Sequence, residues 1–253
     1  MKHDVGKRLV TLRPAAGDPL VRLVCFPFAG GGPDVFRPWA GALDARVELL
    51  SVRLPGRGRR IAEEPYREWE PLLDDAWSAL APLLAEPHAF YGHCFGGRLA
   101  WELTRRAAAE HPGATRRLFV AGCRSPGSPQ QRPLLHALPD DELIAELRRT
   151  GATPAEVLDN PRMTKVFLPV LRGDITLAET WDERRPDATD VPVTAVFGRE
   201  DRVDDEAGMR GWKDVTRGGC ELLGIDGGHF FPETHRPQLI EILNARLEET
   251  WRR

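Results

Sequence analysis

The segment FYGHCFGGRLAW, residues 90–101, constrains the fold more than any other part of this chain. The residues HAFYG have the length and aromatic content of a strand, and FGGRLAWELTRR repeats apolar side chains at helical spacing. Between them, Cys94 lies in the pattern Gly-x-Cys-x-Gly, with Gly92 and Gly96 at the two small positions. A strand that passes directly into a helix needs a sharp turn with small neighbours. The pattern therefore predicts a strand–turn–helix unit that directs the Cys94 thiol toward the N-terminus of the helix.

Short apolar runs recur along the chain and alternate with helical stretches. Each run is strand-length and rich in β-branched or aromatic residues, whereas residues 68–86 and 96–111 carry apolar side chains at helical spacing. This alternation predicts an α/β fold in which helices cover both faces of a mostly parallel sheet. The predicted strands are residues 21–26, 47–53, 88–92, 117–123, 192–198 and 220–225.

Residues 125–186 break the alternation, because three or more helical segments follow one another there without a strand-like run. Asp140 is expected to begin one of these helices and Gly151 to end it. An all-helical insert between two core strands predicts a lid, with helices that only pad the sheet as the alternative. We find no repeat or linker that would divide the chain, so residues 1–253 are predicted to form one domain that carries this insertion.

The composition narrows the class of protein. Hydrophobic residues make up 42% and charged residues 29% of the chain, which suits a soluble globular domain. A formal net charge of -3 argues against a nucleic-acid partner, which normally selects a basic protein. No apolar run is long enough to cross a bilayer, and the N-terminus has no secretory h-region. We therefore expect a cytoplasmic protein without membrane attachment.

Neither the cysteines nor the glycines indicate a cofactor site. The four cysteines are scattered without CxxC pairs, which suits neither a disulfide framework nor a zinc site. The glycine run at residues 30–32 matches neither of the two common nucleotide-binding patterns. The sequence therefore predicts no metal and no diffusible cofactor.

A nucleophile at such a turn requires a carboxylate and then a histidine later in the chain. Asp201 follows a predicted strand in VTAVFGREDRV, and His229 follows the last predicted strand in LLGIDGGHFFPE. These residues predict a catalytic triad of Cys94, Asp201 and His229. Asp204 or Asp205 is the alternative carboxylate, and a structural role is the alternative for His229.

The same chemistry needs two backbone N–H donors for the oxyanion of the reacting carbonyl. One is expected from Phe95, directly after Cys94. The other is expected from Ala29 or Phe28, in the loop CFPFAGGGPDVF that follows an early strand and whose glycines permit tight backbone geometry.

With these residues in place, the chain resembles the type II thioesterases that accompany nonribosomal peptide and polyketide synthetases, a branch of the α/β-hydrolase fold. The resemblance implies an enzyme that removes acyl or aminoacyl groups from the phosphopantetheine thiol of an acyl or peptidyl carrier protein. It also implies the triad above, a mobile helical lid over residues 125–186, and a monomer. The matching segments, in family order, are LVCFPFAGGGPDVFRPW, RLPGRGRR, FYGHCFGG, HALPDDELIAELRRTGATPAEVL, FLPVLRGDITLAETW, FGREDRV and GGHFF.

Cys94 departs from the family, whose members typically carry Ser at this position. Thiol attack on a thioester gives another thioester, so the acyl group can pass on to a second thiol as well as to water. Hydrolytic release is the leading interpretation, and transfer or cyclising release to a thiol, amine or hydroxyl is the alternative. Two further interpretations stay open: a non-catalytic carrier-binding partner, and a Cys94 introduced in place of Ser.

Substrate contacts are expected from two further segments. Arg57 and Arg59 lie in the loop RLPGRGRR, where they are expected to meet the phosphate of phosphopantetheine or an acidic carrier surface, with a solvated loop as the alternative. Phe167 and Trp181 are expected to line the acyl channel, with the core of the lid as the alternative.

Overall fold

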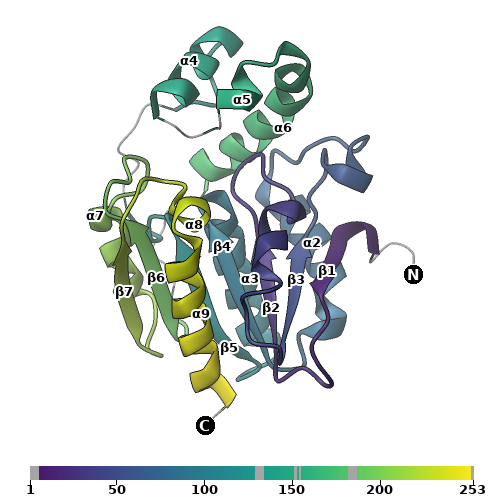
Figure 1. The fold of residues 1–253 in the computed structure, drawn as a ribbon, viewed down its shortest axis with the longest axis vertical. Helices are drawn as coiled ribbons and strands as arrows, with labels where there is room; N and C mark the ends of the chain where they lie inside the picture. The colour runs from purple at the N-terminus through teal and green to yellow at the C-terminus, as the bar shows by residue number, and fades with distance from the viewer. Residues whose placement is uncertain (1–5, 129–133, 151–152, 154, 182–186, 252–253) are drawn as a thin grey trace.

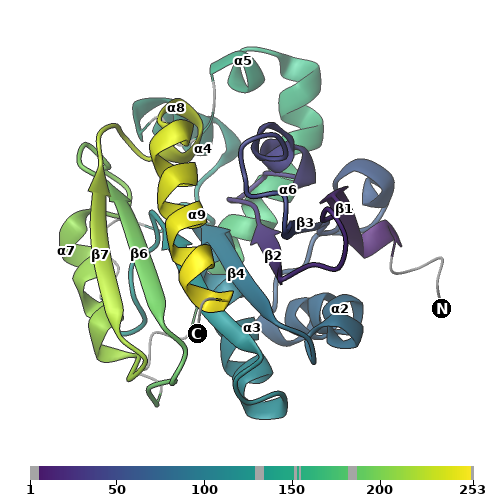
Figure 2. The same ribbon diagram turned by 60° about the horizontal axis from the view of Figure 1, so that its bottom comes forward.

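A computed structural model describes residues 6–128, 134–150, 153, 155–181 and 187–251. Its centre is a seven-stranded sheet in the order β1-β3-β2-β4-β5-β6-β7, with β1 and β7 at the two edges (Figure 2). Every neighbouring pair is parallel except β1 with β3. The predicted α/β fold is confirmed. The strands are β1 (Leu9–Arg13), β2 (Val21–Phe26), β3 (Val47–Val52), β4 (His88–His93), β5 (Thr115–Ala121), β6 (Val193–Gly198) and β7 (Cys220–Ile225).

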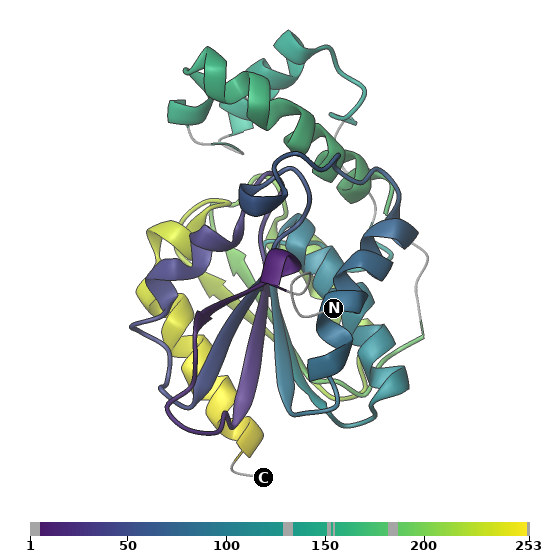
Figure 3. The ribbon, with the colours of Figure 1, turned by 90° about the vertical axis from the view of Figure 1, so that its right-hand side faces the viewer.

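Helices cover both faces of the sheet. In Figure 3, α9 in yellow lies on one side of the strands, and α2 and α3 in blue lie on the other. No helix in the described ranges is both long and apolar enough to cross a membrane. The helices are η1 (Pro33–Trp39), η2 (Gly58–Arg60), α2 (Trp69–Leu80), η3 (Ala81–Leu83), α3 (Phe95–Glu110), α4 (Asp140–Thr150), α5 (Ala155–Leu158), α6 (Pro161–Glu179), α7 (Glu206–Met209), η4 (Arg210–Asp214), α8 (Phe231–Thr234) and α9 (Arg236–Trp251).

Two apolar cores form because successive side chains of a strand point to opposite faces of the sheet. In β4, Phe90 packs with Leu99 of α3 in one core. Its neighbour Tyr91 packs in the other core with Leu243 of α9 and with Trp39, whose ring centroid is 4.8 Å from that of Tyr91. Burial of each large side chain stabilises the fold by about 1.5–3 kcal/mol, so the two cores fix β4 at the centre of the sheet.

The predicted helical insertion contains α4, α5 and α6, which lie together beyond the carboxyl ends of the strands (Figure 1). α4 begins at Asp140, as expected, and Asn160 caps α6 by accepting hydrogen bonds from the N–H groups of Arg162 and Met163. These helices bury a third apolar cluster of their own. Gly151 and several other residues of the predicted insertion lie outside the described residues.

The six predicted strands are all present, and β1 was not predicted. In β1 only Leu9 is buried, so the segment lacks the apolar run by which the other strands were recognised. β1 pairs antiparallel with the edge of β3. The sequence of β1, LVTLR, has no apolar run longer than two residues and therefore gives a weak strand signal.

Candidate active site

The turn after β4 has the strained geometry that the sequence predicts. Cys94 has φ 54° and ψ -118°, and it is the one described residue other than glycine with positive φ. A Cβ atom on Gly92 would lie 2.1 Å from the carbonyl oxygen of Gly96, and a Cβ on Gly96 would lie 2.2 Å from that of Phe26. Only glycine fits at either position. The turn therefore holds Cys94 at the N-terminus of α3, where the helix dipole favours a thiolate.

The structure brings Asp201 and His229 together beside this turn. His229 Nδ1 lies 2.9 Å from Asp201 Oδ2, and both residues are buried. The second oxygen of Asp201 accepts hydrogen bonds from the N–H groups of Val203 and Asp204. His229 and Cys94 line the same cavity and interact electrostatically, and Nε2 is the ring nitrogen that Asp201 leaves available. The carboxylate thus fixes the imidazole so that it faces the thiol.

The two alternative carboxylates have other partners. Asp205 caps α7 by accepting a hydrogen bond from the N–H of Gly208. Asp204 is buried, and its Oδ2 lies 3.9 Å from a guanidinium nitrogen of Arg98. Of the three acids in this loop, Asp201 is therefore the one that orients His229.

The charges of the site stabilise a thiolate beside an imidazolium. Burial raises the pKa of Cys94, but the positive charges of His229 and Arg98 outweigh it, so the thiol pKa lies below its usual value. Burial lowers the pKa of His229, but the Cys94 thiolate and the Asp201 carboxylate outweigh it and raise that pKa to about 10. Each of the two groups therefore favours the charged form of the other.

The predicted oxyanion donors lie around this pair. Phe95 is the first residue of α3, where backbone N–H groups have no partner within the helix. Phe28 and Ala29 follow β2 and line the cavity that contains Cys94. The N–H of Gly30, next in the loop, donates to Asp174 Oδ2 at 2.7 Å and is therefore occupied. Ala29 and Phe28 remain the candidates for the second donor.

A small cavity of about 70 Å³ opens on the reacting groups. Cys94 and His229 form part of its wall together with apolar side chains of α4 and α6. The cavity is lined by Phe28, Ala29, Cys94, Arg98, Arg124, Leu135, Leu147, Leu171, Ile175, Ala178, Glu179, Val203, Asp204, His229 and Phe230.

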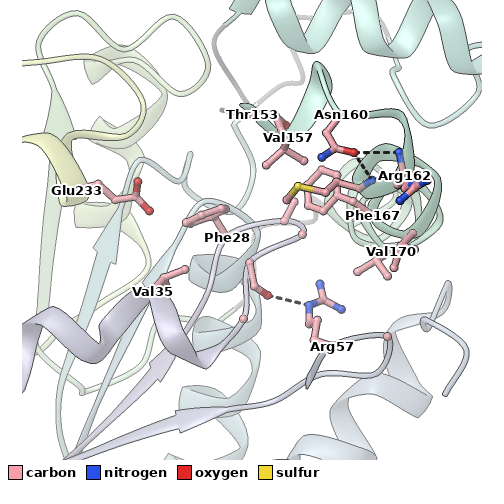
Figure 4. Close-up of a pocket in the computed structure, with 17 residues that line it drawn as sticks. Phe28, Val35, Arg57, Thr153, Val157, Asn160, Arg162, Phe167, Val170 and Glu233 are labelled. Atoms are coloured by element: carbon pink, nitrogen blue, oxygen red, sulfur yellow. Dashed lines mark hydrogen bonds between the residues drawn. The ribbon is translucent and has the colours of Figure 1, made fainter. Parts of the chain in front are cut away.

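A larger cavity of about 720 Å³ lies beside the small one, and Phe28 and Ala29 line both. Figure 4 shows Phe28 from the loop after β2 on one side of it and Phe167 and Val170 from α6 on another. The Phe167 ring packs directly on the loop, because a Cβ on Gly30 would lie 2.4 Å from it. The lid therefore forms a wall of the approach to Cys94.

The other residues predicted to contact substrate, Arg57, Arg59 and Trp181, differ in their exposure and in their hydrogen-bond partners. Arg57 is buried and donates to the carbonyl oxygens of Gly31 and Pro55 and to the Asp174 carboxylate. Arg59 is exposed. Trp181 is buried, its Nε1 donates to Glu102, and it lines neither of the two cavities.

Sequence reasoning missed two charged residues of the site. Arg98 lies one helical turn beyond Cys94, and Asp174 lies in α6, which belongs to the helical insertion. Asp174 joins the lid to the loop of the candidate oxyanion donors, through Gly30 and Arg57. Each is a charged residue at a position where a predicted helix is otherwise apolar, and this was the signal by which both could have been found.

The fold and the site together define a class of protein. A mostly parallel sheet flanked by helices, a strained nucleophile turn after a central strand, and an acid and a histidine after later strands are the features of an α/β-hydrolase. Within the described residues, no group of three His, Cys, Asp or Glu side chains is placed to hold a metal ion.

Comparison with known proteins agrees with this class. The thioesterase domain family matches residues 21–247. AMB antimetabolite synthetase AmbE of Pseudomonas aeruginosa is 36% identical over 93% of this chain, which spans 11% of AmbE. Gramicidin S biosynthesis protein GrsT of Aneurinibacillus migulanus is 30% identical over 90% of this chain and 89% of its own length. The type II thioesterase BorB from the borrelidin biosynthetic cluster superposes with a TM-score of 0.85, at 32% identity over 95% of this chain and 97% of BorB.

The chain therefore belongs to the thioesterase family, and it is an enzyme of the α/β-hydrolase fold.

Proposed function

We propose that the protein hydrolyses acyl or aminoacyl thioesters carried on the phosphopantetheine of an acyl or peptidyl carrier protein, through an acyl-Cys94 intermediate. The observation that carries the proposal is that His229, hydrogen-bonded to Asp201, lines one cavity with Cys94 at the strained turn. Similarity to BorB, a type II thioesterase, and to GrsT, a biosynthesis protein, supports the carrier-bound substrate.

In the acylation step, the Cys94 thiolate attacks the carbonyl carbon of the substrate thioester. The bond from that carbon to the phosphopantetheine sulfur breaks, and the imidazolium of His229 gives its Nε2 proton to the departing thiolate. Asp201 holds Nδ1 throughout and stabilises the cation before transfer. The N–H groups of Phe95 and of Ala29 or Phe28 stabilise the oxyanion.

In the deacylation step, neutral His229 accepts a proton from water as the water oxygen attacks the acyl-Cys94 carbonyl carbon. The bond to Cys94 Sγ breaks and Cys94 leaves as the thiolate, which restores the ion pair with the imidazolium. The product is a free carboxylic acid. The apolar lid side chains around the small cavity strengthen these charge interactions by keeping other water out.

In this proposal, the two cavities bind different parts of the substrate. The larger cavity, lined largely by apolar side chains of α6 and of the loop after β2, receives the pantetheine arm. The small cavity, next to Cys94, receives the acyl group. Exposed Arg59 is the cation of the RLPGRGRR loop that is available to an acidic carrier surface, because Arg57 is engaged by Asp174.

The test follows mass changes in a carrier protein loaded with an acyl or aminoacyl group. Catalytic amounts of enzyme should release free acid over many turnovers, and a quenched sample should contain enzyme acylated at Cys94. The Cys94→Ala variant should release none. A carrier that stays loaded, without acylation of Cys94, would instead support the non-catalytic binding partner.

Transfer to a second acceptor is a distinct candidate, and the thiol of Cys94 is the observation that favours it. An acyl-Cys94 thioester lies near thermoneutral balance with a carrier thioester, so a second carrier thiol can take the group. Label that moves to an unloaded carrier, faster than free acid appears, would establish transfer. In the Cys94→Ser variant the intermediate is an oxygen ester, so the ratio of transfer to hydrolysis should fall.

A further inference from the structure

The wall of the small cavity at Cys94 is mostly apolar and contains four charged side chains, Arg98, Arg124, Glu179 and Asp204. Arg98 is 3% exposed and Asp204 is 4% exposed. Arg98 lines the same cavity as Cys94, and its guanidinium carbon lies 5.7 Å from the centre of the Trp181 ring. The positive charge of Arg98 helps to lower the pKa of the Cys94 thiol, so Arg98 lies close to the atom on which an acyl group would be carried.

Arg98 and Asp204 do not satisfy each other. Their closest charged atoms are 3.9 Å apart, which is beyond hydrogen-bonding distance. Within the part of the chain that the structure describes, Arg98 Nε and Asp204 Oδ2 have no hydrogen-bond partner. By contrast, Glu179 in the same wall accepts hydrogen bonds from the N–H groups of Leu135 and His136. A buried donor and a buried acceptor without partners are costly, and the cost is removed by a ligand that supplies both.

We propose that Arg98 and Asp204 form a polar subsite for the acyl group, specific for acyl thioesters with a hydroxyl or amino group on the carbon next to the thioester carbonyl. The inference rests on the proposed function, because it places the acyl group on Cys94. It assigns a substrate class to that site.

Geometry sets the position of the polar substituent. The carbonyl carbon is bonded to Cys94 Sγ, so the next carbon is two bonds from the sulfur that Arg98 approaches. A hydroxyl or neutral amine there donates to Asp204 Oδ2 and accepts from Arg98, and a protonated amine donates to Asp204. A plain alkyl group would leave both buried polar atoms without partners.

The volume of the cavity limits the size of the acyl group. About 70 Å³ offers room for roughly five water-sized groups. A three-carbon acyl group with one polar substituent fits this volume, whereas a long alkyl chain requires the lid to move. The subsite therefore selects short polar acyl groups.

The test compares three thioesters of N-acetylcysteamine that have equal numbers of non-hydrogen atoms and the same branching: lactoyl, alanyl and isobutyryl. The rate of Cys94 acylation is measured by intact mass and divided by the rate at which each thioester exchanges with glutathione. This division removes differences in intrinsic reactivity. The normalised rates for lactoyl and alanyl should exceed that for isobutyryl by about ten-fold or more.

Variants then assign this preference to the two residues. In Arg98→Met and Asp204→Leu, the preference for the polar acyl groups should fall to near one. Asp204→Asn keeps the size of the side chain and an acceptor oxygen, so it should retain the lactoyl preference and lose part of the alanyl preference. The control Arg116→Met removes an exposed arginine of β5 and should keep both preferences. Near-UV circular dichroism verifies that each variant is folded.

The outcomes separate the subsite from the proposed function. Equal normalised rates in the unmodified protein would overturn the subsite and leave the acyl-Cys94 mechanism intact. A preference that survives in Arg98→Met and in Asp204→Leu would also overturn it. Absence of Cys94 acylation with all three thioesters would overturn the proposed function and the subsite together.

Discussion

At the scale of single residues, the surroundings of Cys94 set it apart from the other thiols. Burial raises the pKa of Cys25 well above its usual value, that of Cys123 to about 12 and that of Cys220 to about 11, whereas the pKa of Cys94 is lowered. The thiolate is the form that reacts with alkylating agents. Iodoacetamide at pH 6 should therefore label Cys94 alone, which peptide mass spectrometry would show. Equal labelling of Cys220 would contradict this assignment.

The pH profile of that labelling depends on His229. Because the pKa of Cys94 is lowered, labelling persists below the usual thiol range and is lost as pH falls through the Cys94 pKa. The imidazolium loses its proton as pH rises through about 10, so thioester turnover, which needs that proton, should decline there. In His229→Asn the cation is absent, and the labelling profile should shift to higher pH. An unchanged profile would show that His229 does not stabilise the thiolate.

The glycines of the turn give a second prediction at this scale. In Gly96→Ala, the new Cβ would lie 2.2 Å from the carbonyl oxygen of Phe26, and backbone atoms cannot yield as a flexible side chain would. We expect the free energy of unfolding to fall by about 3 kcal/mol. Urea denaturation followed by circular dichroism measures the loss. The control is Gly41→Ala, which is exposed with nothing within 4 Å of the added Cβ and should change stability by less than about 0.5 kcal/mol.

Sequence reasoning found the residues whose role depends on close neighbours in the chain. It missed those whose role depends on contacts with distant segments. The turn at Cys94 is visible because its steric requirement involves glycines within two positions. Arg98 and Asp174 were missed, and Arg57 was expected to meet the substrate. Arg57 is buried against Asp174, and Arg98 shares a cavity wall with Asp204, in each case across distant segments of the chain. A single sequence does not show such pairings.

At the scale of elements, apolar runs predicted six strands, including the half-buried edge strand β7, and failed for β1. The helices of residues 125–186 were predictable from periodicity and from their Gly and Pro boundaries. Their place over the carboxyl edge of the sheet rests on tertiary contacts, such as the hydrogen bond from Trp69 Nε1 to the Leu177 carbonyl oxygen at 2.9 Å. The covering of the site by the lid is therefore a property of the packed molecule.

Asp174 gives the prediction that belongs to α6. It is 3% exposed and pairs with buried Arg57, so Asp174→Asn leaves a buried guanidinium without its counter-charge. Breaking such a pair typically costs about 3–5 kcal/mol. The control is Asp140→Asn in α4, whose exposed carboxylate pairs with Arg172 and should contribute less than about 1 kcal/mol. Urea midpoints of the two variants decide the comparison, and equal midpoints would show that the pair does not anchor the lid.

At the scale of the whole molecule, the apolar clusters define two regions that we expect to unfold separately: the sheet with its two cores, and the helical insertion. The two cores on either side of the sheet share the same strands, so neither can open without the other. The lid cluster contains Leu143 and Leu147 of α4 and reaches the core beside α3 through Ala29. Leu177, near the end of α6, belongs to that core instead.

This division predicts that the lid opens without global unfolding. Regions with few contacts to the main core open locally, at a free energy below that of complete unfolding. In hydrogen exchange followed by mass spectrometry, peptides from α4 should exchange faster than those from β4 and α3, and their exchange should respond weakly to low urea concentrations. The end of α6 near Leu177 should exchange with the core and serves as the internal control. Exchange of α4 at the same rate as β4, with the same dependence on urea, would show that the lid and the sheet unfold as one unit.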